Sequence, residues 1–402
     1  MTSTQRIAIL GAGPIGLEAA LFAVEAGFEV DVYERDEPGA HVERWEHVRL
    51  FSPWKMNRSS WGEAALREAG FEVADADAFP TGREYLDRYL LPLSRIEPLV
   101  GRIHEHSRVV GVARRDALKG DFIGDERRAA GPFVLLVDTD TGERYVEADI
   151  VIDTTGVYDQ PGHLGPGGLP ALGERSAEAL IERYIPDVLG AQRPMYAQNT
   201  TLLVGSGYSA VTTARLFDTL HAEEPGTRLF WLLLEDKPPL APIPDDPLSG
   251  RLELSEFGSE AATGRVDGIE PVYGQLHRIA HRAEGMGAEG LGVEIALADG
   301  SRTLEIDRII ANVGYRPDPS VYRELQVHQC YATEGPMKLS AYLLAQKGDG
   351  GGDCLQQTSG GFDTLVSPEP NFYILGSKSY GRNSDFLLKL GFEQIEELFS
   401  RV

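Results

Sequence analysis

The feature that most constrains the fold of this chain is a glycine-rich turn near its start. The segment 6–10 (RIAIL) leads into Gly11-Ala12-Gly13-Pro14-Ile15-Gly16, and an Ala- and Leu-rich run and a second strand-like segment, 28–34 (FEVDVYE), follow. This order predicts a strand, a tight turn, a helix and a second strand. In such a unit the first glycine permits the turn, the second lets a pyrophosphate approach the backbone, and the third lets the helix pack closely on the strand. The first amides of the helix then face the phosphates, so the turn predicts a dinucleotide site.

The acidic residue Glu34 strengthens this interpretation. It follows the glycines by about 20 residues and ends the second predicted strand, where a carboxylate accepts both hydroxyls of an adenosine ribose and disfavours a phosphorylated ribose. A G-x-G-x-x-G pattern alone is a weak signal, because glycine turns are common. Here the strand before it, the helix after it and the acid at the right distance make an ordinary turn the less favoured alternative.

The same pattern occurs a second time. The apolar run 200–204 is followed by Gly205-Ser206-Gly207-Tyr208-Ser209-Ala210, by a helical pattern and by a further apolar run, 228–234. Ala210 takes the third position and is still small enough for close packing of a helix. The repeat therefore predicts a second dinucleotide site.

The strand of this second unit ends in Glu235-Asp236. An acid at this position favours a ribose hydroxyl over a 2′-phosphate, and hence NADH over NADPH. Lys237 lies beside the acid, and Arg251 and Arg265 are basic residues that could fold back to it. The choice between the two nicotinamide cofactors stays open.

The charge balance argues against two classes of partner. The chain has 402 residues with 38 basic and 62 acidic side chains, a formal net charge of −24, which repels nucleic acids and anionic membranes. The first residues run straight into the first predicted strand, and the longest fully apolar run, 229–234, is too short to cross a bilayer. We therefore expect a cytoplasmic protein with no nucleic-acid partner and no membrane partner.

The two cysteines, Cys330 and Cys354, lie in no C-x-x-C pattern. This predicts two free thiols rather than a disulfide framework or a zinc site, with a redox pair between the thiols as the alternative. His277 and His281 stand at i and i+4 of a predicted helix, 271–281, and are expected to face solvent rather than bind a metal. We expect no metal site.

The other patterns supply a meander, two crossings and the C-terminal elements. In the first part of the chain we expect a capping box of Thr81 and Glu84 at a helix start, a meander of strands at 109–112, 133–138 and 145–147 with a charged mobile tip at 115–131, and a strand that ends in Asp153-Thr154-Thr155-Gly156. In the middle we expect a flexible loop at 237–268, a hairpin of 293–297 and 303–306, and a similar crossing at 308–314. Near the C-terminus we expect a glycine loop at 348–353, a strand at 371–376, and a helix from Asp385 with Asn383 or Ser384 as its N-cap.

These patterns predict an α/β fold of two Rossmann-like dinucleotide-binding domains, the second inserted into the first, with an antiparallel β-meander. The expected domains are a first domain that begins with 1–165, an inserted domain at 166–308, and the C-terminal part of the first domain at 309–402.

The two glycine motifs, the Asp153-Thr154-Thr155-Gly156 crossing and the C-terminal strand, loop and helix together resemble the flavoproteins with two dinucleotide-binding domains. Within this pyridine nucleotide-disulfide oxidoreductase superfamily the chain looks most like the flavin-containing and N-hydroxylating monooxygenases. Thr155-Gly156 matches their A-T-G crossing, 38–45 resembles their G-x-x-W covering loop, and Gly376 with 386–388 resembles their second flavin-binding motif.

The resemblance implies FAD on the first domain and NAD(P)H on the second. The residues expected to contact FAD are Gly11, Gly13, Pro14, Ile15, Gly16, Glu34, Arg35, Trp45, Val109, Thr155, Gly156, Gly376, Ser377, Phe386 and Leu387. The residues expected to contact NAD(P)H are Gly205, Ser206, Gly207, Tyr208 and Ser209. The aromatic segment 41–57 either covers a flat ring system or is a surface loop whose Trp residues fill the core.

Two departures from the superfamily bear on the reaction. The disulfide-reductase branch needs a C-x-x-C or C-x4-C beside the flavin, and the chain has neither, which disfavours that chemistry. The F-x-G-x-x-x-H fingerprint of the monooxygenase branch is also absent from the sequence.

The resemblance implies hydride transfer from NAD(P)H to the flavin, after which dioxygen forms a flavin C4a-(hydro)peroxide that oxygenates a small-molecule substrate. The catalytic candidates near the ring are Arg49, Ser52, Asn57 and Arg382, with Lys378 as a further polar group. A helix N-terminus at 385–387 is expected to stabilise negative charge on the reduced ring. The alternatives are a FAD-dependent NAD(P)H dehydrogenase or reductase, and a FAD-binding protein without turnover. The sequence leaves open the substrate and whether the chain forms a homodimer.

Overall fold

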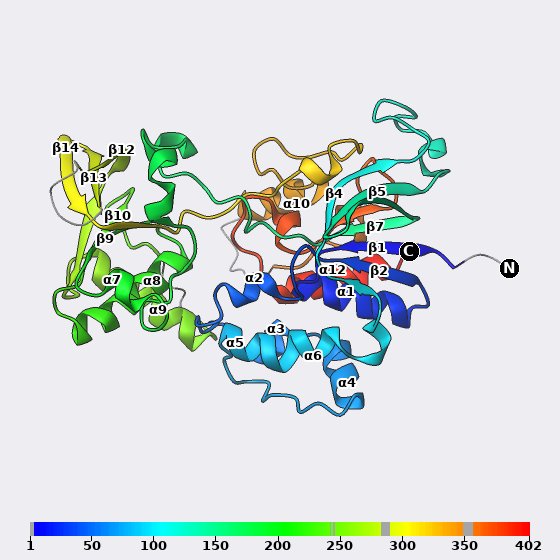
Figure 1. Cartoon of the computed structure of the whole chain (residues 1–402), viewed down its shortest axis with the longest axis horizontal. Helices are drawn as coiled ribbons and strands as arrows, with labels where there is room; N and C mark the ends of the chain where they lie inside the picture. Colours follow the sequence, from blue (N-terminus) through cyan, green and yellow to red (C-terminus); the bar gives the residue numbers. More distant parts are fainter. Residues whose placement is uncertain (1–3, 242, 244–245, 283–289, 349–356) are drawn as a thin grey trace. The chain divides into compact units, whose positions relative to one another are not determined.

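The computed structural model describes residues 4–241, 243, 246–282, 290–348 and 357–402. The described chain forms two compact units, each with its own parallel sheet (Figure 1). The first unit comprises Met1–Gln160 and Arg316–Val402, and the inserted unit comprises Pro161–Tyr315. The predicted α/β class, with parallel sheets and antiparallel strands, is confirmed.

The first unit is built on five parallel strands in the spatial order β16-β7-β1-β2-β3. Leu10, the last residue of β1, pairs with Tyr33 of β2 and with Asp153 of β7. Because parallel strands end at one edge of the sheet, the residues that follow these three strands gather at that edge. The strands are β1 (Arg6–Leu10), β2 (Glu29–Tyr33), β3 (Ile103–His104), β7 (Ile150–Asp153) and β16 (Phe372–Ile374).

Alternation along β1 explains how the sheet is covered on both faces. Ile7 and Ile9 point to one face and pack with helices α1 (Pro14–Glu25) and α12 (Leu388–Phe399). Ala8 and Leu10 point to the other face and pack with an antiparallel sheet, β4-β5-β6. Successive side chains of a strand face opposite ways, so the four consecutive apolar residues 7–10 are buried on both sides.

The antiparallel sheet is the predicted meander. It consists of β4 (Ser107–Arg114), β5 (Phe133–Thr139) and β6 (Gly142–Ala148). The capping box is also confirmed: Glu84 N donates to Thr81 Oγ1 over 3.1 Å, and Thr81 N donates to Glu84 Oε2 over 2.7 Å. The further helices described in the first unit are α2 (Ala40–Glu43), α3 (Trp54–Asn57), α4 (Ser60–Glu68), α5 (Gly82–Tyr85), the π-helix η1 (Leu86–Leu90), α6 (Leu91–Ser94), α10 (Met337–Gly348) and α11 (Phe362–Leu365), with 3-10 turns η2 (Glu97–Leu99), η3 (Glu126–Ala129), η6 (Ser320–Tyr322) and η8 (Gly376–Tyr380).

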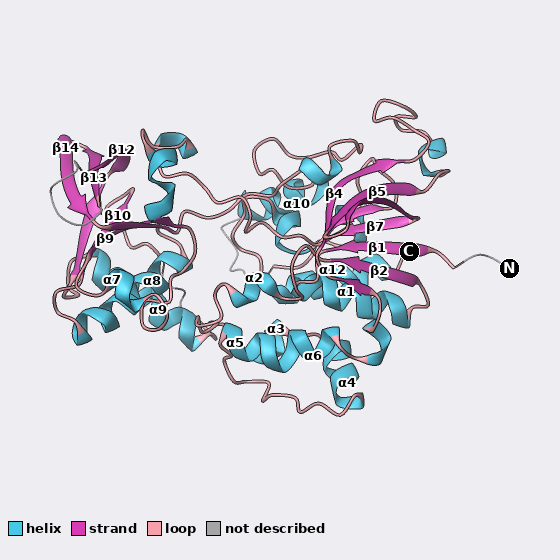
Figure 2. Ribbon diagram, in the orientation of Figure 1, coloured by secondary structure: helices cyan, strands magenta, loops and turns pink. Residues whose placement is uncertain are grey.

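The inserted unit repeats this plan (Figure 2). Its parallel sheet has the order β11-β10-β9-β15-β8, and its core is closed by the antiparallel sheet β12-β13-β14. The strands are β8 (Ile181–Glu182), β9 (Thr200–Val204), β10 (Arg228–Leu233), β11 (Ile269–Tyr273), β12 (Gln275–His281), β13 (Leu291–Leu297), β14 (Gly300–Ile306) and β15 (Arg308–Ala311). The helices and 3-10 turns are η4 (Pro166–Gly168), η5 (Glu174–Leu180), α7 (Arg193–Tyr196), α8 (Tyr208–Glu223) and α9 (Ser249–Ala262).

Two local expectations in the inserted unit are wrong. The predicted helix at 271–281 is instead the end of β11 followed by β12, so His277 and His281 do not share a helix face. In β12 the buried residues Leu276 and Ile279 lie three apart because the register shifts between Leu276 and Arg278, and this bulge imitates a helical spacing. The predicted flexible loop at 237–268 contains the four-turn helix α9.

The start of the C-terminal helix also differs from the expectation. Helix α12 begins at Leu388, and its N-cap is Leu387 rather than Asn383 or Ser384. The segment before it forms the 3-10 turn η8, whose residue Gly376 is fixed by a hydrogen bond from its N–H to Gln394 Oε1 of α12, 2.8 Å long. The predicted glycine loop at 348–353 lies almost entirely outside the described residues, and Cys354 lies outside them as well.

Candidate functional site

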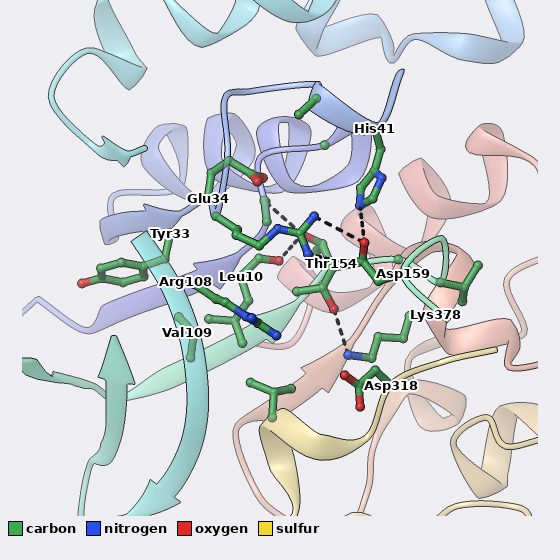
Figure 3. A pocket seen from close by; sticks show the side chains of 18 of the residues that line it. Leu10, Tyr33, Glu34, His41, Arg108, Val109, Thr154, Asp159, Asp318 and Lys378 are labelled. Carbon is green, nitrogen blue, oxygen red and sulfur yellow. Dashed lines mark hydrogen bonds and ion pairs between the residues drawn. The ribbon is translucent and has the colours of Figure 1, made fainter. Parts of the chain in front are cut away.

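The first glycine turn opens into a cleft of the first unit, at the carboxyl ends of β1, β2 and β7 (Figure 3). The cleft holds about 1070 Å³ of space outside the protein atoms, counting the part open to solvent. In parallel α/β sheets this edge is where ligands bind. The cleft is lined by Leu10, Gly11, Gly13, Pro14, Tyr33, Glu34, Arg35, Gly39, Ala40, His41, Val42, Arg108, Val109, Val110, Thr154, Thr155, Gly156, Val157, Asp159, Gln160, Arg316, Asp318, Ser320, Val321 and Lys378.

The three glycines of the turn meet different constraints. Gly11 has a φ of +95°, a left-handed conformation that favours glycine. A Cβ on Gly16 would lie 1.9 Å from the Gly11 carbonyl oxygen and 2.7 Å from Thr154 Oγ1, so close packing requires glycine there. A Cβ on Gly13 would meet nothing within 4 Å. The backbone at Gly13 therefore borders open space in the cleft, which is the room that a pyrophosphate needs.

Helix α1 begins at Pro14, directly after Gly13. Gly13 has no side chain with which to cap the helix, whereas Ser59 and Thr81 cap helices α4 and α5. The first amides of α1 therefore have no side-chain acceptor from the N-cap position. A helix end of this kind favours an anion.

Glu34 stands at the wall of the cleft, immediately after β2. Its Oε2 accepts a hydrogen bond from Ala12 N over 2.6 Å, and its Oε1 accepts one from Asp36 N over 2.9 Å. These two bonds fix the carboxylate against the turn. Each carboxylate oxygen has a second lone pair, so Glu34 can also accept ribose hydroxyls.

Three charged or titratable side chains that line the cleft form a cluster, and two of them, His41 and Asp159, are labelled in Figure 3. Arg35 donates to both oxygens of Asp159, over 2.7 and 3.3 Å, and His41 Nε2 lies 3.7 Å from Asp159 Oδ1. The contact with His41 and the hydrogen bonds from Arg35 hold the pKa of Asp159 well below its usual range, although burial opposes them. The same contact with Asp159 raises the pKa of Arg35. Asp159 is therefore ionised, and the cluster joins β2, α2 and the segment after β7.

A second charged pair lies at the end of β7. Lys378 Nζ donates to Asp153 Oδ2 over 2.7 Å and to Thr155 Oγ1 over 2.8 Å, and both charged side chains are almost fully buried. Thr155 also donates its N–H and its hydroxyl to Asp153 Oδ1. These bonds fix the crossing beside Gly156 and orient the Lys378 ammonium at the edge of the cleft.

The structure brings about half of the predicted FAD contacts together. Gly11, Gly13, Pro14, Glu34, Arg35, Val109, Thr155 and Gly156 line the cleft. Ile15 instead packs on Gly376 and Gly391, and Gly16 packs on Gly11. Ser377 Oγ approaches Gly156, Trp45 packs on Gly82, Phe386 packs on Tyr380, and Leu387 precedes α12.

The four catalytic candidates, all in the described part of the chain, lie outside the lining of this cleft. Ser52 Oγ donates to Asn57 Oδ1 over 2.8 Å, and Asn57 Nδ2 donates back to the Ser52 carbonyl over 2.9 Å. Arg49 donates to the Phe79 carbonyl. Arg382 lies 3.7 Å from Glu334 and lines a smaller, separate pocket. Their catalytic roles stay predictions.

Sequence reasoning did not single out several charged residues of the cleft. His41, Arg108, Asp159, Arg316 and Asp318 all line it. Asp159 follows Gly156 by three residues, and Asp318 follows Gly314 by four. Both come just after a strand and a glycine crossing. Their position after a strand end is the feature of the sequence that could have predicted that they line the cleft.

The second glycine turn repeats the geometry of the first within the inserted unit. Gly205 has a φ of +133°, and a Cβ there would lie 2.1 Å from the Asn312 carbonyl oxygen. A Cβ on Gly207 would meet nothing within 4 Å, and α8 starts at the next residue, Tyr208. Ser206 and Ser209 are exposed beside it. A helix end next to open space is therefore built twice in this chain.

Comparison with known proteins identifies this architecture. No protein-family model and no curated protein matches the chain. The bacillithiol disulfide reductase Bdr (YpdA) from Bacillus cereus matches with a TM-score of 0.67, at 18% identity over 100% of both chains. The chain has the fold of the flavoproteins with two dinucleotide-binding domains.

The fold is shared by flavoproteins with different reactions. Ornithine N-hydroxylase KtzI from Kutzneria sp. 744 matches with a TM-score of 0.67, at 16% identity over 99% of this chain and 98% of that one. Thioredoxin reductase from T. acidophilum matches with a TM-score of 0.61, at 14% identity over 99% of both chains. A reductase and a hydroxylase are thus equally similar, so the fold does not select the reaction. Among the described residues, no helix has the length and apolar character needed to cross a membrane.

Proposed function

We propose that the chain is a FAD-dependent oxidoreductase that takes hydride from NAD(P)H. The observation that carries the proposal is the open space beside Gly13 at the start of α1, inside a cleft, and its repetition at Gly207. The known structures of this fold include one described with reduced FAD and NADP+, KtzI, and one described with FAD, DfoA from Erwinia amylovora. When bound, FAD supplies a ring that accepts hydride from a reduced nicotinamide.

The residues of the cleft fit the adenosine and pyrophosphate of FAD. The amides at the start of α1 stabilise the pyrophosphate charge, and the space beside Gly13 admits it. Glu34, already fixed against Ala12, accepts ribose hydroxyls. The Arg35, His41 and Asp159 cluster holds the surrounding segments in place before FAD binds, which lowers the ordering cost of binding.

Two further groups of the first unit supply charge near the proposed FAD site. Helix α12 begins after Leu387, whose side chain cannot cap it, and its residue Gly391 packs on Ile15 of the first turn. The first amides of α12 would favour negative charge on a group bound next to them. Lys378 adds a fixed ammonium at the cleft, where its bonds to Asp153 and Thr155 orient it. Neither group needs to move a proton for hydride transfer.

For the reaction beyond hydride transfer we propose oxygenation of a small molecule by dioxygen. The chain has only two cysteines, in no C-x-x-C, which argues against a redox disulfide beside the flavin. The second candidate is a reductase without oxygenation. It is favoured by the similarity of the fold to a bacillithiol disulfide reductase, which equals the similarity to the ornithine N-hydroxylase. Hydrogen bonds with Thr333 lower the pKa of the Cys330 thiol, but this thiol is buried.

The test uses the purified full chain loaded with FAD. Bleaching of the visible flavin absorbance by NADH or NADPH supports the oxidoreductase, and yellow protein that neither nucleotide bleaches contradicts it. Oxygen uptake that yields an oxygenated product when a substrate is added supports the oxygenase. Bleaching with electron transfer to dyes, and no oxygenated product, supports the reductase.

A further inference from the structure

The two glycine turns can be aligned residue by residue through strand register. In the first unit Leu10 pairs with Tyr33, and Gly11 N donates to the Tyr33 carbonyl. In the inserted unit Val204 pairs with Leu232, and Gly205 N lies 3.4 Å from the Leu232 carbonyl oxygen to which it donates. The turns therefore superpose with Leu232 in the place of Tyr33.

In this alignment, no acidic residue of the second turn corresponds to Glu34 of the first. The residue in the place of Glu34 is Leu233, which is buried and has no group that accepts a hydroxyl. Leu234 follows and is 71% exposed, and the first carboxylate, Glu235, stands two positions later than Glu34 does. The second turn thus differs from the first at the position that reads the adenosine ribose.

The basic residues that could bind a 2′-phosphate are paired with carboxylates or lie far from the second glycine turn. Between β10 and β11 the sequence has three, Lys237, Arg251 and Arg265. Lys237 pairs with Glu235, which cancels its charge locally. Arg251 is buried and donates to both oxygens of Asp246, over 2.6 and 2.8 Å.

Arg265 lies at the wrong edge of the sheet. It precedes β11, whose first residue, Ile269, pairs with Leu229 near the start of β10. The glycine turn lies at the other end of these strands, about 17 Å away for strands of this length. On α8, Arg215 is paired with Glu253 over 3.3 Å.

We infer that the second turn binds NAD(H) in preference to NADP(H), and that Glu235 is the residue that decides this. The inference rests on the proposed function, since it names the cofactor of the same site. With Leu233 in the ribose-reading position, the charge that a 2′-phosphate would meet first is that of Glu235 and Asp236. Glu235, Asp236 and Lys237 together carry a net charge of −1, which repels a phosphate of charge near −2, whereas a ribose hydroxyl can donate to the carboxylates.

The test is calorimetric titration of the FAD-loaded full chain with NAD+ and, separately, with NADP+. We expect NAD+ to bind at least about tenfold more tightly. Glu235→Arg is expected to tighten NADP+ binding about tenfold, because it adds a cation and frees Lys237, and to weaken NAD+ binding, because it removes a ribose acceptor. Glu235 is exposed, so the Glu235→Arg variant is expected to fold. Glu235→Gln is expected to tighten NADP+ binding by a smaller factor.

Asp299→Arg is the matched control. It makes the same change of charge at an exposed residue of the inserted unit, in the turn between β13 and β14. If NADP+ binds the native protein as tightly as NAD+, or if Glu235→Arg and Asp299→Arg shift the ratio equally, the inference is overturned while the proposed function stands. If neither nucleotide binds the FAD-loaded protein, the proposed function fails, and the inference fails with it.

Discussion

Gly13 and Gly16 belong to one turn but are needed for different reasons. Gly16 is required by packing, because a Cβ there would clash with the backbone of Gly11. Gly13 has a φ of −78° that any residue adopts and open space around it, so a side chain there disturbs a ligand rather than the fold.

This contrast gives a prediction for the two glycines. Gly13→Val is expected to weaken FAD binding about 100-fold while the free energy of unfolding of the protein without FAD changes by less than about 0.5 kcal/mol. Gly16→Ala is expected to destabilise the protein without FAD by about 1–3 kcal/mol through overpacking. FAD titration and urea unfolding measure the two effects.

Gly120→Val is the control for Gly13→Val. Gly120 also has open space around it and lies outside the cleft lining, between β4 and β5. Its substitution should leave FAD binding unchanged. Normal FAD binding by Gly13→Val would show that no pyrophosphate occupies the space beside α1.

Glu18 is a buried carboxyl on α1 that is expected to make stability depend on pH. Burial raises the pKa of Glu18 to about 7 from an ordinary value of 4.5, although hydrogen bonds from Ser59 and Tyr89 oppose the shift. Between these two pH values the unfolded chain releases the proton and the folded chain keeps it. The free energy of unfolding should therefore fall by about 3 kcal/mol as pH rises from below 4.5 to above 7.

Glu18→Gln should remove this part of the pH dependence. The glutamine keeps one of the two oxygen acceptors, places an NH2 group where the other stood, and does not titrate. Urea unfolding at about pH 5 and about pH 8 measures the difference for both proteins. An equal loss of stability in the native protein and in Glu18→Gln would assign the pH dependence to other groups.

At the scale of elements, a buried group of charges joins three segments of the first unit. Glu369 Oε1 accepts from Arg114 Nε of β4 over 2.7 Å, and Glu369 Oε2 accepts from Arg128 of η3 over 2.8 Å and from Gln326 N over 2.8 Å. The side chains of the two arginines are 2% exposed and that of Glu369 is not exposed. The segment 115–131, expected to be a charged mobile tip, is thus anchored at Arg128.

Glu369→Gln should be strongly destabilising, because it leaves two buried arginines without their anion. We expect a loss of about 3–5 kcal/mol in the free energy of unfolding. Glu147→Gln is the matched control, since Glu147 pairs with the exposed Arg115 over 2.9 Å and its loss should cost about 0–1 kcal/mol. Urea unfolding of both variants measures this, and equal costs would contradict the structural role of the buried group.

At the scale of the whole molecule, each unit has its own sheet and its own apolar core. We therefore expect two unfolding transitions in a calorimetric scan. FAD should stabilise the transition of the first unit by about 2.7 kcal/mol at 100 times its dissociation constant, and a nicotinamide dinucleotide should act on the other transition. A single transition that both ligands raise equally would show that the units unfold as one.

Local patterns in the sequence were sufficient for the architecture. The glycine turns, the strand at 6–10 and the meander follow from steric limits and from side-chain alternation, which act over a few residues. The capping box at Thr81 and the repeated turn at Gly205 are local for the same reason. The prediction of a helix at 271–281 was wrong because the spacing of its buried residues comes from a bulge in β12. This bulge depends on the pairing of β12 with β13, which the local sequence does not report.

The composition of the site was decided by tertiary structure. Asp159 meets Arg35 from 124 residues away, and Lys378 meets Asp153 from 225 residues away. No local pattern reports such pairs, because sheet order and register place the strand ends that carry them. The sequence alone predicted where two dinucleotides bind, because the steric limits of a glycine turn act over a few residues. The folded chain decided that Leu233 rather than an acid stands where Glu34 stands in the first turn, since only strand pairing sets that correspondence.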